Sequence, residues 1–453
     1  MTPLSTTRRH FLTSTSAIAA GAWIAPRFAI GRPGLSANSR VNLAFIGVGG
    51  RGALNLQGLS AENVVALCDV DDLNAAESFN AHPKAARFRD FRQMLDKIGK
   101  EIDAVVVSTP DHTHFAATMA SMELGKHVFC EKPLAHTVRE ARTMKKAAQH
   151  YKVISMMGNQ GHATEGIRYV KEWYDAGVLG QVTEVSAWLG AINFNGRFFR
   201  KPAAFPPAAM PVPANLDWNL WLGPCSKEIP YNPVYHPRAW RGFFEFGSGL
   251  MGDWSCHTLD APFWALGLGM PTVVELESSA QGPTGFVPEA AVVRFEFPAR
   301  GDKPAVVLHW HEGLPKPELR KAWGLEQLGE AGMIMTGDKC CLMTGERPDS
   351  PRLIPDEKWL DFRKSLPPKV IPRIKGGHYT EWIDAIRGDG PQPGSNFDYA
   401  AGLTEVALLG ALAQRFGGRI EYDSAEMKVT NRPELNAYLR IAAREGWKYG
   451  ESL

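Results

Sequence analysis

The chain of 453 residues has few cysteines, and they lack the spacing of zinc sites and of redox-active pairs. No CxxC pair occurs among the six. Two of them end apolar runs typical of buried strands, where a thiol behaves as a small hydrophobic group. The other four support no particular disulfide, and we expect no metal site. The six are Cys68, Cys130, Cys225, Cys256, Cys340 and Cys341.

The sequence also has no block of like charge and no long apolar run. Lysine and arginine number 50, aspartate and glutamate number 48, and the two signs are interspersed, for a net charge of +2. This pattern lacks the basic footprint of a nucleic-acid-binding protein. No segment offers the roughly 20 unbroken apolar residues that cross a bilayer. We therefore expect neither a nucleic-acid partner nor a stable membrane anchor.

Residues 1–39 differ in character from the rest of the chain. The pair Arg8-Arg9 precedes a weakly apolar stretch from Leu12 to Ala25, and together they resemble a twin-arginine export signal. The stretch is too short and too rich in Ser, Thr and Ala to cross about 30 Å of hydrocarbon. Such a signal predicts a periplasmic protein that is exported already folded. The rest of the chain is longer than one hydrophobic core usually serves, which favours two domains.

A glycine motif marks the start of the folded chain. The apolar run Val41 to Ile46 leads into Gly47-Val48-Gly49-Gly50-Arg51-Gly52, and a second apolar run, Val64 to Cys68, ends at Asp69. On its own, GxGxxG also occurs in glycine-rich surface turns. Here a buried strand, a tight turn, a helix N-terminus and an acid about 20 residues later predict a site for the pyrophosphate and ribose of a dinucleotide.

Asp69 favours NAD over NADP. Its carboxylate repels a 2′-phosphate, and no arginine follows between Val70 and Ala81 to bind one. We therefore expect NAD as the cofactor.

Strand and helix patterns alternate over residues 40–158. The strands are continuous apolar runs, as strands buried on both faces require. This alternation predicts an α/β fold that begins with a Rossmann domain, a parallel sheet with helices on both faces. Beyond the glycine motif we expect strands at 104–107 and 127–130 and helices at 73–82, 91–98, 114–124 and 137–150.

From residue 159 to residue 453 strands follow strands. Period-2 alternation shows in Val293, Phe295 and Phe297. We expect a second, α+β domain whose open sheet is largely antiparallel. Its expected strands lie at 182–189, 271–280, 290–297, 305–311 and 332–343, and a buried helix spans 399–416.

Two short motifs follow strand ends at the ligand-binding edge of the first sheet. Ser108-Thr109-Pro110 ends one strand, and its hydroxyls either contact the cofactor or cap the next helix. Glu131-Lys132-Pro133 ends another strand and places Lys132 beside the expected nicotinamide. Taken alone, Lys132 also fits a solvated surface lysine.

A third motif, Gly252-Asp253-Trp254-Ser255-Cys256-His257, suits acid–base chemistry. Asp253 and His257 are four positions apart, so a helix places them on one face. Alcohol oxidation requires a base for the hydroxyl proton, imidazole has a pKa suited to neutral pH, and a carboxylate would orient the ring. The alternative is a helix-capping aspartate and a buried core histidine.

In this order and spacing, these motifs resemble those of the Gfo/Idh/MocA oxidoreductase family, named for glucose-fructose oxidoreductase and inositol dehydrogenase. The resemblance covers essentially everything after residue 39. It implies Lys132, Asp253 and His257 as catalytic residues, a sugar or polyol substrate, and homo-oligomers formed through the open C-terminal sheet. The exported glucose-fructose branch also uses a twin-arginine leader and holds its nucleotide tightly. Thr430-Asn431-Arg432-Pro433 with Gly446-Trp447 resembles a large exported subgroup.

The expected binding residues combine these motifs with an aromatic segment. Five tryptophans lie between residues 218 and 264, near His236 and Arg238. Their rings and forked arginine donors suit a sugar, although such tryptophans also form cores. Asn159, Gln160 and His162 follow the last Rossmann strand and are expected to face the same cleft. Expected cofactor contacts are Gly47, Gly49, Gly50, Arg51, Gly52, Asp69, Ser108, Thr109, Pro110, His114, Glu131, Lys132 and Gln160, and expected substrate contacts are Lys132, Asn159, His162, Tyr235, Arg241, Asp253 and His257.

Three functions are consistent with the sequence. The favoured one is an NAD-dependent oxidoreductase that acts on a sugar, glycoside or polyol hydroxyl. The second is an NAD-dependent glycoside hydrolase that oxidises C3 transiently so that the glycosidic bond is eliminated. The third is a non-catalytic protein that binds a nucleotide or a sugar, and the joint presence of Lys132, Asp253 and His257 argues against it.

Overall fold

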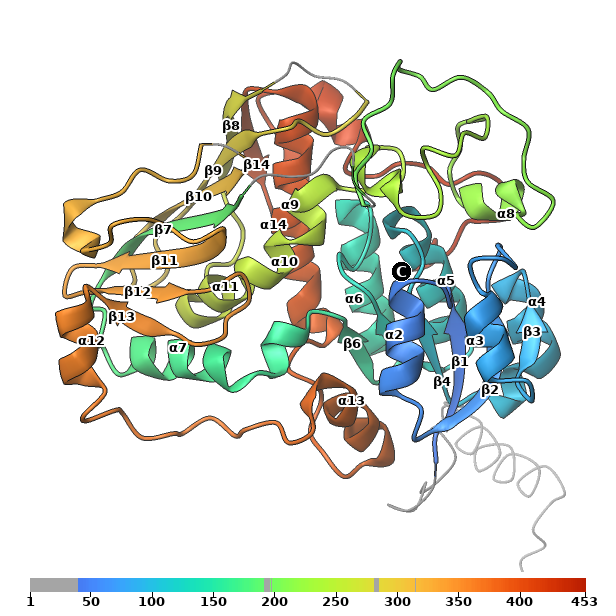
Figure 1. Cartoon of the computed structure of the whole chain (residues 1–453), viewed down its shortest axis with the longest axis horizontal. Coiled ribbons are helices and arrows are strands. Elements are labelled where there is room, and N and C mark those ends of the chain that lie inside the picture. Colours follow the sequence, from blue (N-terminus) through green and yellow to red (C-terminus); the bar gives the residue numbers. More distant parts are fainter. Residues whose placement is uncertain (1–39, 191–195, 197, 281–284, 314) are drawn as a thin grey trace, which may run out of the picture.

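The computed structural model describes residues 40–190, 196, 198–280, 285–313 and 315–453. The expected export signal, residues 1–39, lies outside these ranges. Within them, two β-sheets lie side by side with helices packed on and between them (Figure 1). The predicted α/β class and both predicted sheet types are confirmed.

The first sheet is a Rossmann sheet of parallel strands in the order β3-β2-β1-β4-β5-β6. Its central strands are buried on both faces, which explains their unbroken apolar runs. The edge strand β3 was not predicted because it is short and only partly buried. The strands are β1 (Asn42–Ile46), β2 (Asn63–Cys68), β3 (Ala86–Phe88), β4 (Ala104–Val107), β5 (His127–Cys130) and β6 (Ser155–Met157).

Helices cover both faces of this sheet. Ala44 and Ile46 of β1 point to α4, α5 and α6, whereas Leu43 and Phe45 point to α2 and α3. Helix α5 begins earlier than expected, directly after its N-cap residue Pro110. The helices are α2 (Arg51–Gly58), α3 (Ala76–Ala81), α4 (Phe91–Ile98), α5 (Asp111–Glu123) and α6 (Val138–Tyr151).

The second sheet has the order β13-β12-β11-β7-β10-β9-β8-β14-β15. The pair β7 and β10 is parallel and the other described pairs are antiparallel. The expected single strand over 332–343 is wrong, because a turn at Gly337 divides it into β11 and β12. The strands are β7 (Val182–Leu189), β8 (Val273–Ser279), β9 (Ala291–Phe297), β10 (Val306–Glu312), β11 (Ala331–Gly337), β12 (Cys341–Thr344), β13 (Arg352–Ile354), β14 (Arg419–Asp423) and β15 (Lys428–Val429).

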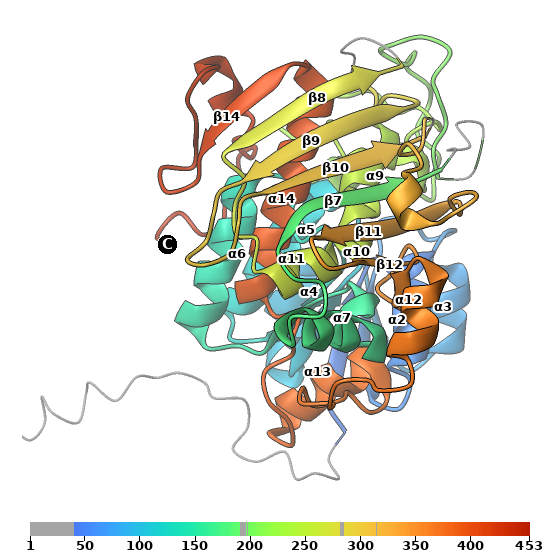
Figure 2. The same cartoon turned by 90° about the vertical axis from the view of Figure 1, so that its left-hand side faces the viewer.

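Helices pack against one face of the second sheet, and the strands form the front layer in Figure 2. On β9, the side chains of Val293, Phe295 and Phe297 are buried. Arg294 and Glu296 alternate with them and stay partly exposed. The alternation predicted for this strand is therefore confirmed. The remaining helices are α7 (Glu165–Asp175), α8 (Trp218–Leu222), α9 (Gly249–Asp253), α10 (Ser255–Thr258), α11 (Asp260–Leu266), α12 (Asp356–Phe362), α13 (Gly377–Arg387) and α14 (Phe397–Phe416).

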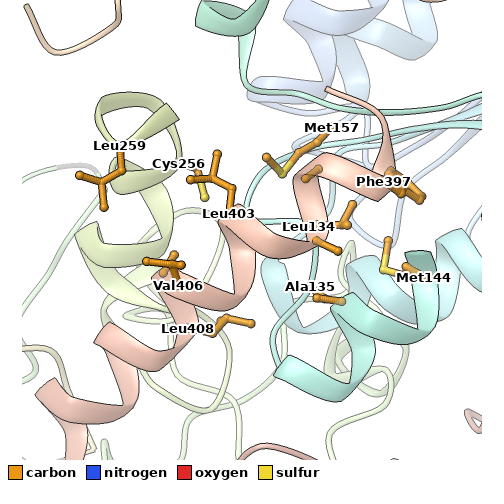
Figure 3. Close-up of a cluster of buried hydrophobic side chains, with 14 of the residues drawn as sticks. Leu134, Ala135, Met144, Met157, Cys256, Leu259, Phe397, Leu403, Val406 and Leu408 are labelled. Carbon is orange, nitrogen blue, oxygen red and sulfur yellow. The ribbon is translucent and has the colours of Figure 1, made fainter. Parts of the chain in front are cut away.

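The buried helix α14 joins the two domains. Leu134, in the turn after β5, and Cys256, on α10, both pack along it (Figure 3). The backbone N–H of Leu134 donates a hydrogen bond to Thr404 Oγ1 on this helix at 3.2 Å. Because one rigid helix touches both segments, it fixes the turn after β5 relative to α10.

Late segments of the chain return to the first domain. Trp382 and Ile383 of α13 are buried beneath the Rossmann sheet. Near the C-terminus, Trp447 packs edge-on to Phe91 of α4, with ring centroids 5.8 Å apart. The predicted C-terminal domain, residues 159–453, therefore completes the packing of the nucleotide-binding half.

Candidate active site

A cavity of about 930 Å³ lies at the carboxyl edge of the Rossmann sheet, facing α9 and α10. Its volume is at the upper end of ordinary ligand sites. Residues from both domains line it, so the fold brings together motifs that are far apart in the sequence. From the expected sites, the lining residues are Gly47, Gly49, Gly50, Arg51, Asp69, Ser108, Thr109, Pro110, His114, Glu131, Lys132, Gln160, Arg241, Asp253 and His257.

The glycine turn has the geometry that a dinucleotide requires. Gly47 has a φ of +79°, which favours glycine. A Cβ at Gly52 would lie 1.8 Å from the carbonyl oxygen of Gly47, so only glycine lets α2 start this close to β1. Gly52 supports the turn from beneath and is not among the residues that line the cavity. The N-cap of α2, Gly50, has no side chain to block a pyrophosphate, so the turn fits this group.

Asp69 closes the turn from the end of β2. Its carboxylate accepts hydrogen bonds from the backbone N–H groups of Val48 (2.9 Å), Gly49 (3.3 Å) and Asp71 (3.0 Å). Burial raises the pKa of Asp69 from its usual value, although these donors oppose the shift. The residue lines the cavity beside the glycine turn, a position that fits a ribose-binding acid.

The fold also brings an arginine to this wall. The backbone N–H of Asp69 donates to the carbonyl of Phe88 at 3.1 Å, and the residue after Phe88 is Arg89, which lines the cavity. The guanidinium of Arg89 pairs with Asp72. No arginine occurs within residues 70–81, but the pairing of β2 with β3 brings Arg89, further along the chain, to the same wall as Asp69.

The helix-capping alternative for Ser108 and Thr109 is wrong. The N-cap of α5 is Pro110, and no side chain caps this helix. Ser108 Oγ accepts a hydrogen bond from Asn55 Nδ2 at 2.9 Å. Thr109 Oγ1 is buried and has no hydrogen-bond partner within the described ranges. Thr109 lines the cavity, but this oxygen is itself closed off from it.

His114 links the ends of two strands. Its Nδ1 and Nε2 each lie 2.8 Å from a carbonyl oxygen, those of Pro133 and Thr109 respectively. Burial by itself lowers the pKa of His114, but the Cys130 sulfur, the Asp111 carboxylate and the Pro133 carbonyl raise it to about 9. The ring is therefore charged near neutral pH and donates to both carbonyls.

Glu131 is a buried carboxylate that ties α2 to the end of β5. Its Oε1 accepts hydrogen bonds from Arg51 Nε (2.7 Å) and Asn55 Nδ2 (2.9 Å). Burial favours the neutral acid, but the charges of Arg51 and Lys132 lower the pKa of Glu131 below its usual value. Tyr379 of α13 donates to Asn55 Oδ1 at 2.6 Å, so the late helix also supports this wall.

Lys132 reaches across the cavity to Asp253. Its Nζ donates to the backbone carbonyl of Asp253 at 2.6 Å and to the Asp253 carboxylate. Arg241 Nε approaches the same carboxylate at 3.6 Å. Burial by itself raises the pKa of Asp253, but the charges of Lys132 and Arg241 hold it well below its usual range. Asp253 is thus ionised and fixes the position of the lysine.

Gly252 lets α9 approach the lysine turn closely enough for this contact. A Cβ at Gly252 would lie 1.8 Å from Ser248 Oγ and 3.2 Å from a ring carbon of Pro133. Ser248 itself donates to the Asp111 carboxylate at 2.8 Å, at the start of α5. The second domain is therefore anchored beside the turn that carries Lys132.

His257 lies beside this ion pair and lines the cavity. The expected single helix is broken at Trp254, between α9 and α10, and Asp253 and His257 both line the cavity from the two sides of this break. His257 Nδ1 is buried and has no hydrogen-bond partner among the described residues. The expectation that Asp253 orients this ring is therefore corrected, because Asp253 pairs with Lys132.

The electrostatic setting of His257 also differs from expectation. Burial, followed by the charges of Lys132 and Arg347, lowers the pKa of His257 well below its usual value. The imidazole is therefore neutral at neutral pH, which is the protonation state of a base. The expected pKa near neutrality is corrected accordingly.

Two arginines that lie over aromatic rings approach the group formed by Lys132, Asp253 and His257. Arg241 Cζ lies 4.3 Å from the ring centroid of Trp240, and Arg347 Cζ lies 5.0 Å from that of Trp254. Arg347 also donates to Glu346 Oε1 at 2.6 Å. Forked donors beside apolar ring faces suit a carbohydrate, which presents hydroxyls and C–H faces together.

Asn159 and His162 were expected to face the cleft, but neither of them lines it. Asn159 Nδ2 donates to Asp260 Oδ2 at 2.9 Å, and His162 Nδ1 lies 2.8 Å from Asp260 Oδ1. Tyr399 adds a hydrogen bond to the same carboxylate at 2.5 Å. All four side chains are engaged in this network, which holds the start of α11 against α14 outside the cavity lining.

Tyr235 belongs to an aromatic core, which corrects its expected place in the cleft. It is 4% exposed, and its ring centroid lies 4.6 Å from that of Phe243 and 5.3 Å from that of Phe246. Burial raises the pKa of Tyr235 to about 12. Of the five tryptophans, Trp221, Trp240 and Trp254 line the cavity, whereas Trp218 and Trp264 do not.

Several residues of the cavity wall were not predicted from the sequence. They lie in loops next to the second sheet or follow β3, where neither periodicity nor a motif marks them. Their positions become visible only when the strands are paired. They include Arg89, Glu330, Glu346 and Arg347.

The described part of the chain has neither a helix suited to crossing a membrane nor a cluster of metal-binding side chains. None of its helices is both long and apolar enough to cross a membrane. Nor do the same ranges contain three or more His, Cys, Asp or Glu side chains grouped to hold a metal ion.

Two profiles of one protein family match the chain. The Gfo/Idh/MocA profile described as an oxidoreductase family with an NAD-binding Rossmann fold matches residues 41–159. A second profile, described as the C-terminal alpha/beta domain of this oxidoreductase family, matches residues 164–292. Together they cover more than half of the chain.

Similarity to curated proteins is partial. A levoglucosan dehydrogenase of Pseudarthrobacter phenanthrenivorans is 25% identical over 178 residues, which are 39% of this chain and 36% of the relative. A glycosyl hydrolase family 109 protein of Shewanella sp. strain MR-4 is 31% identical over 204 residues, 39% of this chain and 44% of the relative. The chain thus matches less than half of the length of these relatives.

Solved structures share the fold over most of the chain. The WlbA dehydrogenase of Bordetella pertussis in complex with NADH and UDP-GlcNAcA aligns with a TM-score of 0.58 and 18% identity, over 85% of this chain and 99% of that one. A levoglucosan dehydrogenase in complex with NADH and levoglucosan aligns with a TM-score of 0.55 and 17% identity, over 84% and 99%. At these identities the likeness concerns the fold.

Proposed function

We propose that this chain, which belongs to the Gfo/Idh/MocA family of NAD-dependent oxidoreductases, transfers hydride between bound NAD and a hydroxyl-bearing carbon of a sugar, glycoside or polyol. The observation that carries the proposal is the meeting of Lys132, Asp253 and His257 in the cavity that also contains the glycine turn and Asp69. The relatives named as dehydrogenases of sugar derivatives support the substrate class.

Each member of the trio has a distinct role in this proposal. Bound NAD supplies the hydride acceptor at its nicotinamide ring. The neutral imidazole of His257 takes the hydroxyl proton while the adjacent carbon loses hydride and becomes a carbonyl. Lys132 donates a hydrogen bond to the reacting oxygen, and the ionised Asp253 holds the lysine in place. The trio therefore both positions and deprotonates the substrate.

The first experiment identifies the nucleotide and the substrate together. Nucleotide released from the purified protein is identified by mass spectrometry, and the protein is then screened with free sugars and aryl glycosides. We expect NAD to be released and at least one sugar to reduce it. A protein that binds no nicotinamide nucleotide and converts none of these compounds would contradict the proposal and favour a non-catalytic binding role.

A glycoside hydrolase is the second candidate function, and the 31% identity to a family 109 glycosyl hydrolase favours it. In that reaction C3 is oxidised, the glycosidic bond is eliminated, water adds, and the hydride returns to C3, so no net oxidation occurs. Aryl glycosides separate the two functions. Release of the aryl alcohol without accumulation of NADH indicates hydrolysis, whereas NADH formed in proportion to product indicates a dehydrogenase.

We also propose that the folded protein is exported by the twin-arginine route. The support is the Arg8-Arg9 pair and the short apolar stretch that follows it, within residues 1–39. The double change Arg8→Lys and Arg9→Lys is expected to leave the protein in the cytoplasm, as measured by cell fractionation. An unchanged distribution would contradict the proposal.

A further inference from the structure

We propose that the second domain supplies half of the nucleotide site through residues 215–238, here called the cap segment, and that Arg238 of this segment binds the pyrophosphate of NAD. The inference depends on the cofactor class of the family and not on the identity of the sugar. It predicts that NAD leaves the protein only when the cap segment detaches.

The cap segment docks on the loop that follows β2, next to the expected ribose site. The backbone N–H of Asp217 donates to the carbonyl of Val70 at 2.9 Å. In the other direction, the backbone N–H of Asp72 donates to the carbonyl of Asn215 at 3.1 Å. These reciprocal backbone bonds join the two domains directly at the nucleotide side of the cavity.

Asp71 anchors both ends of the cap segment with one carboxylate. Its Oδ1 accepts a hydrogen bond from Asn215 Nδ2 at 2.6 Å, and its Oδ2 lies 2.7 Å from His236 Nε2. Burial by itself raises the pKa of Asp71, but the hydrogen bonds from His236 and Asn215 lower it to about 2. The carboxylate is therefore ionised, and it is only 5% exposed, so water competes weakly for these contacts.

The middle of the cap segment is fixed by two further contacts. His112 Nε2, at the start of α5, lies 3.0 Å from the carbonyl oxygen of Trp221. Near the C-terminus, Arg444 Nη1 donates to Asn219 Oδ1 at 2.8 Å. The segment is thus held at its ends and at α8, and its inner side, which includes Trp221, His236 and Arg238, lines the cavity.

Arg238 lies over the glycine turn. A Cβ built on Gly50 would be 3.6 Å from Arg238 Nη2, so the guanidinium covers the N-cap of α2. The carbonyl of Arg238 accepts a hydrogen bond from Arg241 Nη1 at 3.1 Å, which ties its backbone to the substrate end of the cavity. A guanidinium offers phosphate a planar pair of donors, and the first turn of α2 favours the same anion from the opposite side. The guanidinium and the first turn of α2 therefore lie close enough to bind the same anion.

The test measures NAD release rather than sugar turnover. NAD is loaded into the full-length protein, and its dissociation rate is followed by gel filtration and by displacement with an excess of labelled NAD. We expect Arg238→Ala to release NAD at least about 10-fold faster, because most changes in affinity appear in the dissociation rate. The double change Asn215→Ala and His236→Ala, which leaves Asp71 in place, is expected to accelerate release to a similar extent.

Two further variants make the result specific. Arg238→Lys keeps the charge without the fork, so an intermediate rate is expected. Arg363→Ala removes an exposed arginine at the end of α12, away from the cavity lining, and is expected to leave the rate unchanged. Thermal unfolding of each nucleotide-free variant checks that the fold is retained.

The inference would be overturned if the wild type released NAD as fast as Arg238→Ala does. Equal release rates in the wild type and in both cap variants would overturn it as well. If a variant fails to fold, the Arg238→Lys comparison decides, since this change is small. Tight NAD retention by a wild-type protein that converts no sugar would instead contradict the proposed function and leave the cap segment as the nucleotide wall.

Discussion

At the residue scale, the site is governed by opposing effects of burial and charge. Burial alone would neutralise Asp253, yet Lys132 and Arg241 keep it ionised. The same lysine adds to burial in keeping His257 neutral. One cation thus prepares an anionic anchor and an uncharged base in the same cavity, which is the combination that proton removal from an alcohol requires.

Replacement of the two proton-handling residues tests this assignment. His257→Ala and Lys132→Ala are each expected to lower kcat by about 10²- to 10⁴-fold, the usual contribution of a general acid or base, while NAD stays bound. Steady-state kinetics on a substrate from the sugar screen, with nucleotide content measured in parallel, provide the readout. If the two residues share one proton transfer, the double variant loses less than the product of the single losses.

The pH profile gives a second readout for His257. Because its pKa lies well below the usual 6.5, the neutral base persists into mildly acidic solution. The acid limb of kcat/KM for sugar oxidation is therefore expected below pH 6.5 and is expected to disappear in His257→Ala. Full activity in that variant would return His257 to the role of a buried core histidine.

Asp69 is expected to decide between NAD and NADP. Its carboxylate faces the cavity beside the glycine turn and repels a 2′-phosphate. Asp69→Ala is expected to weaken NAD binding and to reduce the ratio of the affinity for NAD to the affinity for NADP. Titration of the variant with both nucleotides measures this ratio. Arg89→Ala in the same background separates the two effects, since Arg89 is the nearby cation that a 2′-phosphate would contact. Wild-type protein that binds NADP as tightly as NAD would contradict this account.

At the element scale, the ends of β4 and β5 are held together by His114. Its folded-state pKa of about 9 exceeds the ordinary value of 6.5, so its stabilisation is fully present below pH 6.5 and is lost as the pH rises through 9. A shift of this size corresponds to about 3 kcal/mol. We expect the free energy of unfolding of the wild type to fall over this range in chemical denaturation.

His114→Asn supplies the matched control for that expectation. The variant is expected to be less stable at pH 6.5 and to lose most of the dependence on pH between 6.5 and 9. His150→Asn, at the exposed end of α6, is expected to leave both properties unchanged. Equal pH dependence in His114→Asn and wild type would show that another group is responsible.

Elements with a strong local signal were predictable, and those placed by pairing were not. Apolar runs predicted the strand Asn42–Ile46 and the buried helix α14, and the glycines predicted the turn between β1 and α2. The short strand β3 and the division between β11 and β12 carry little local signal, so their positions depend on neighbouring strands. The one-residue helix break at Trp254 likewise has no proline at that position to mark it in the sequence.

The same distinction applies to the site. Lys132, Asp253 and His257 belong to motifs and were identified from sequence, and the structure places them in one cavity. Asn159 and His162 were misplaced because their sequence position after β6 does not reveal the buried acceptor Asp260. Sequence proximity to a strand end thus indicates the edge of the sheet but not the direction of a side chain.

At the scale of the whole molecule, the active site exists only because the domains are locked together. Helix α14 packs against the turn after β5 and against α10 (Figure 3), and the reciprocal bonds of the cap segment close the nucleotide side. The Lys132 contact to Asp253 crosses the same boundary. Separation of the domains is therefore expected to release the proposed cofactor and to part Lys132 from Asp253 and His257.

The face of the second sheet that the helices leave uncovered carries charged side chains. Arg294 lies 2.5 Å from Glu296 and within 3.8 Å of Glu275 on the neighbouring strand, and His309 lies 3.6 Å from Glu277. These charged side chains of both signs come from β8, β9 and β10, which belong to the front layer of strands in Figure 2. Two copies related by a two-fold axis can therefore meet with complementary charges.

We accordingly expect a homo-oligomer formed through this sheet. Arg294→Glu replaces this cation by a carboxylate that lies among other carboxylates. The resulting like-charge repulsion is expected to raise the dissociation constant of the oligomer by at least about 10-fold, or about 1.4 kcal/mol. Light scattering after size exclusion, over a range of protein concentrations, measures the effect, and Lys364→Glu, at an exposed position just after the end of α12, is the charge-matched control. Because exposed charges are screened by salt, the wild-type oligomer is also expected to weaken as ionic strength rises. A wild-type monomer at every concentration, or an oligomer indifferent to Arg294→Glu, would show that this face serves no such contact.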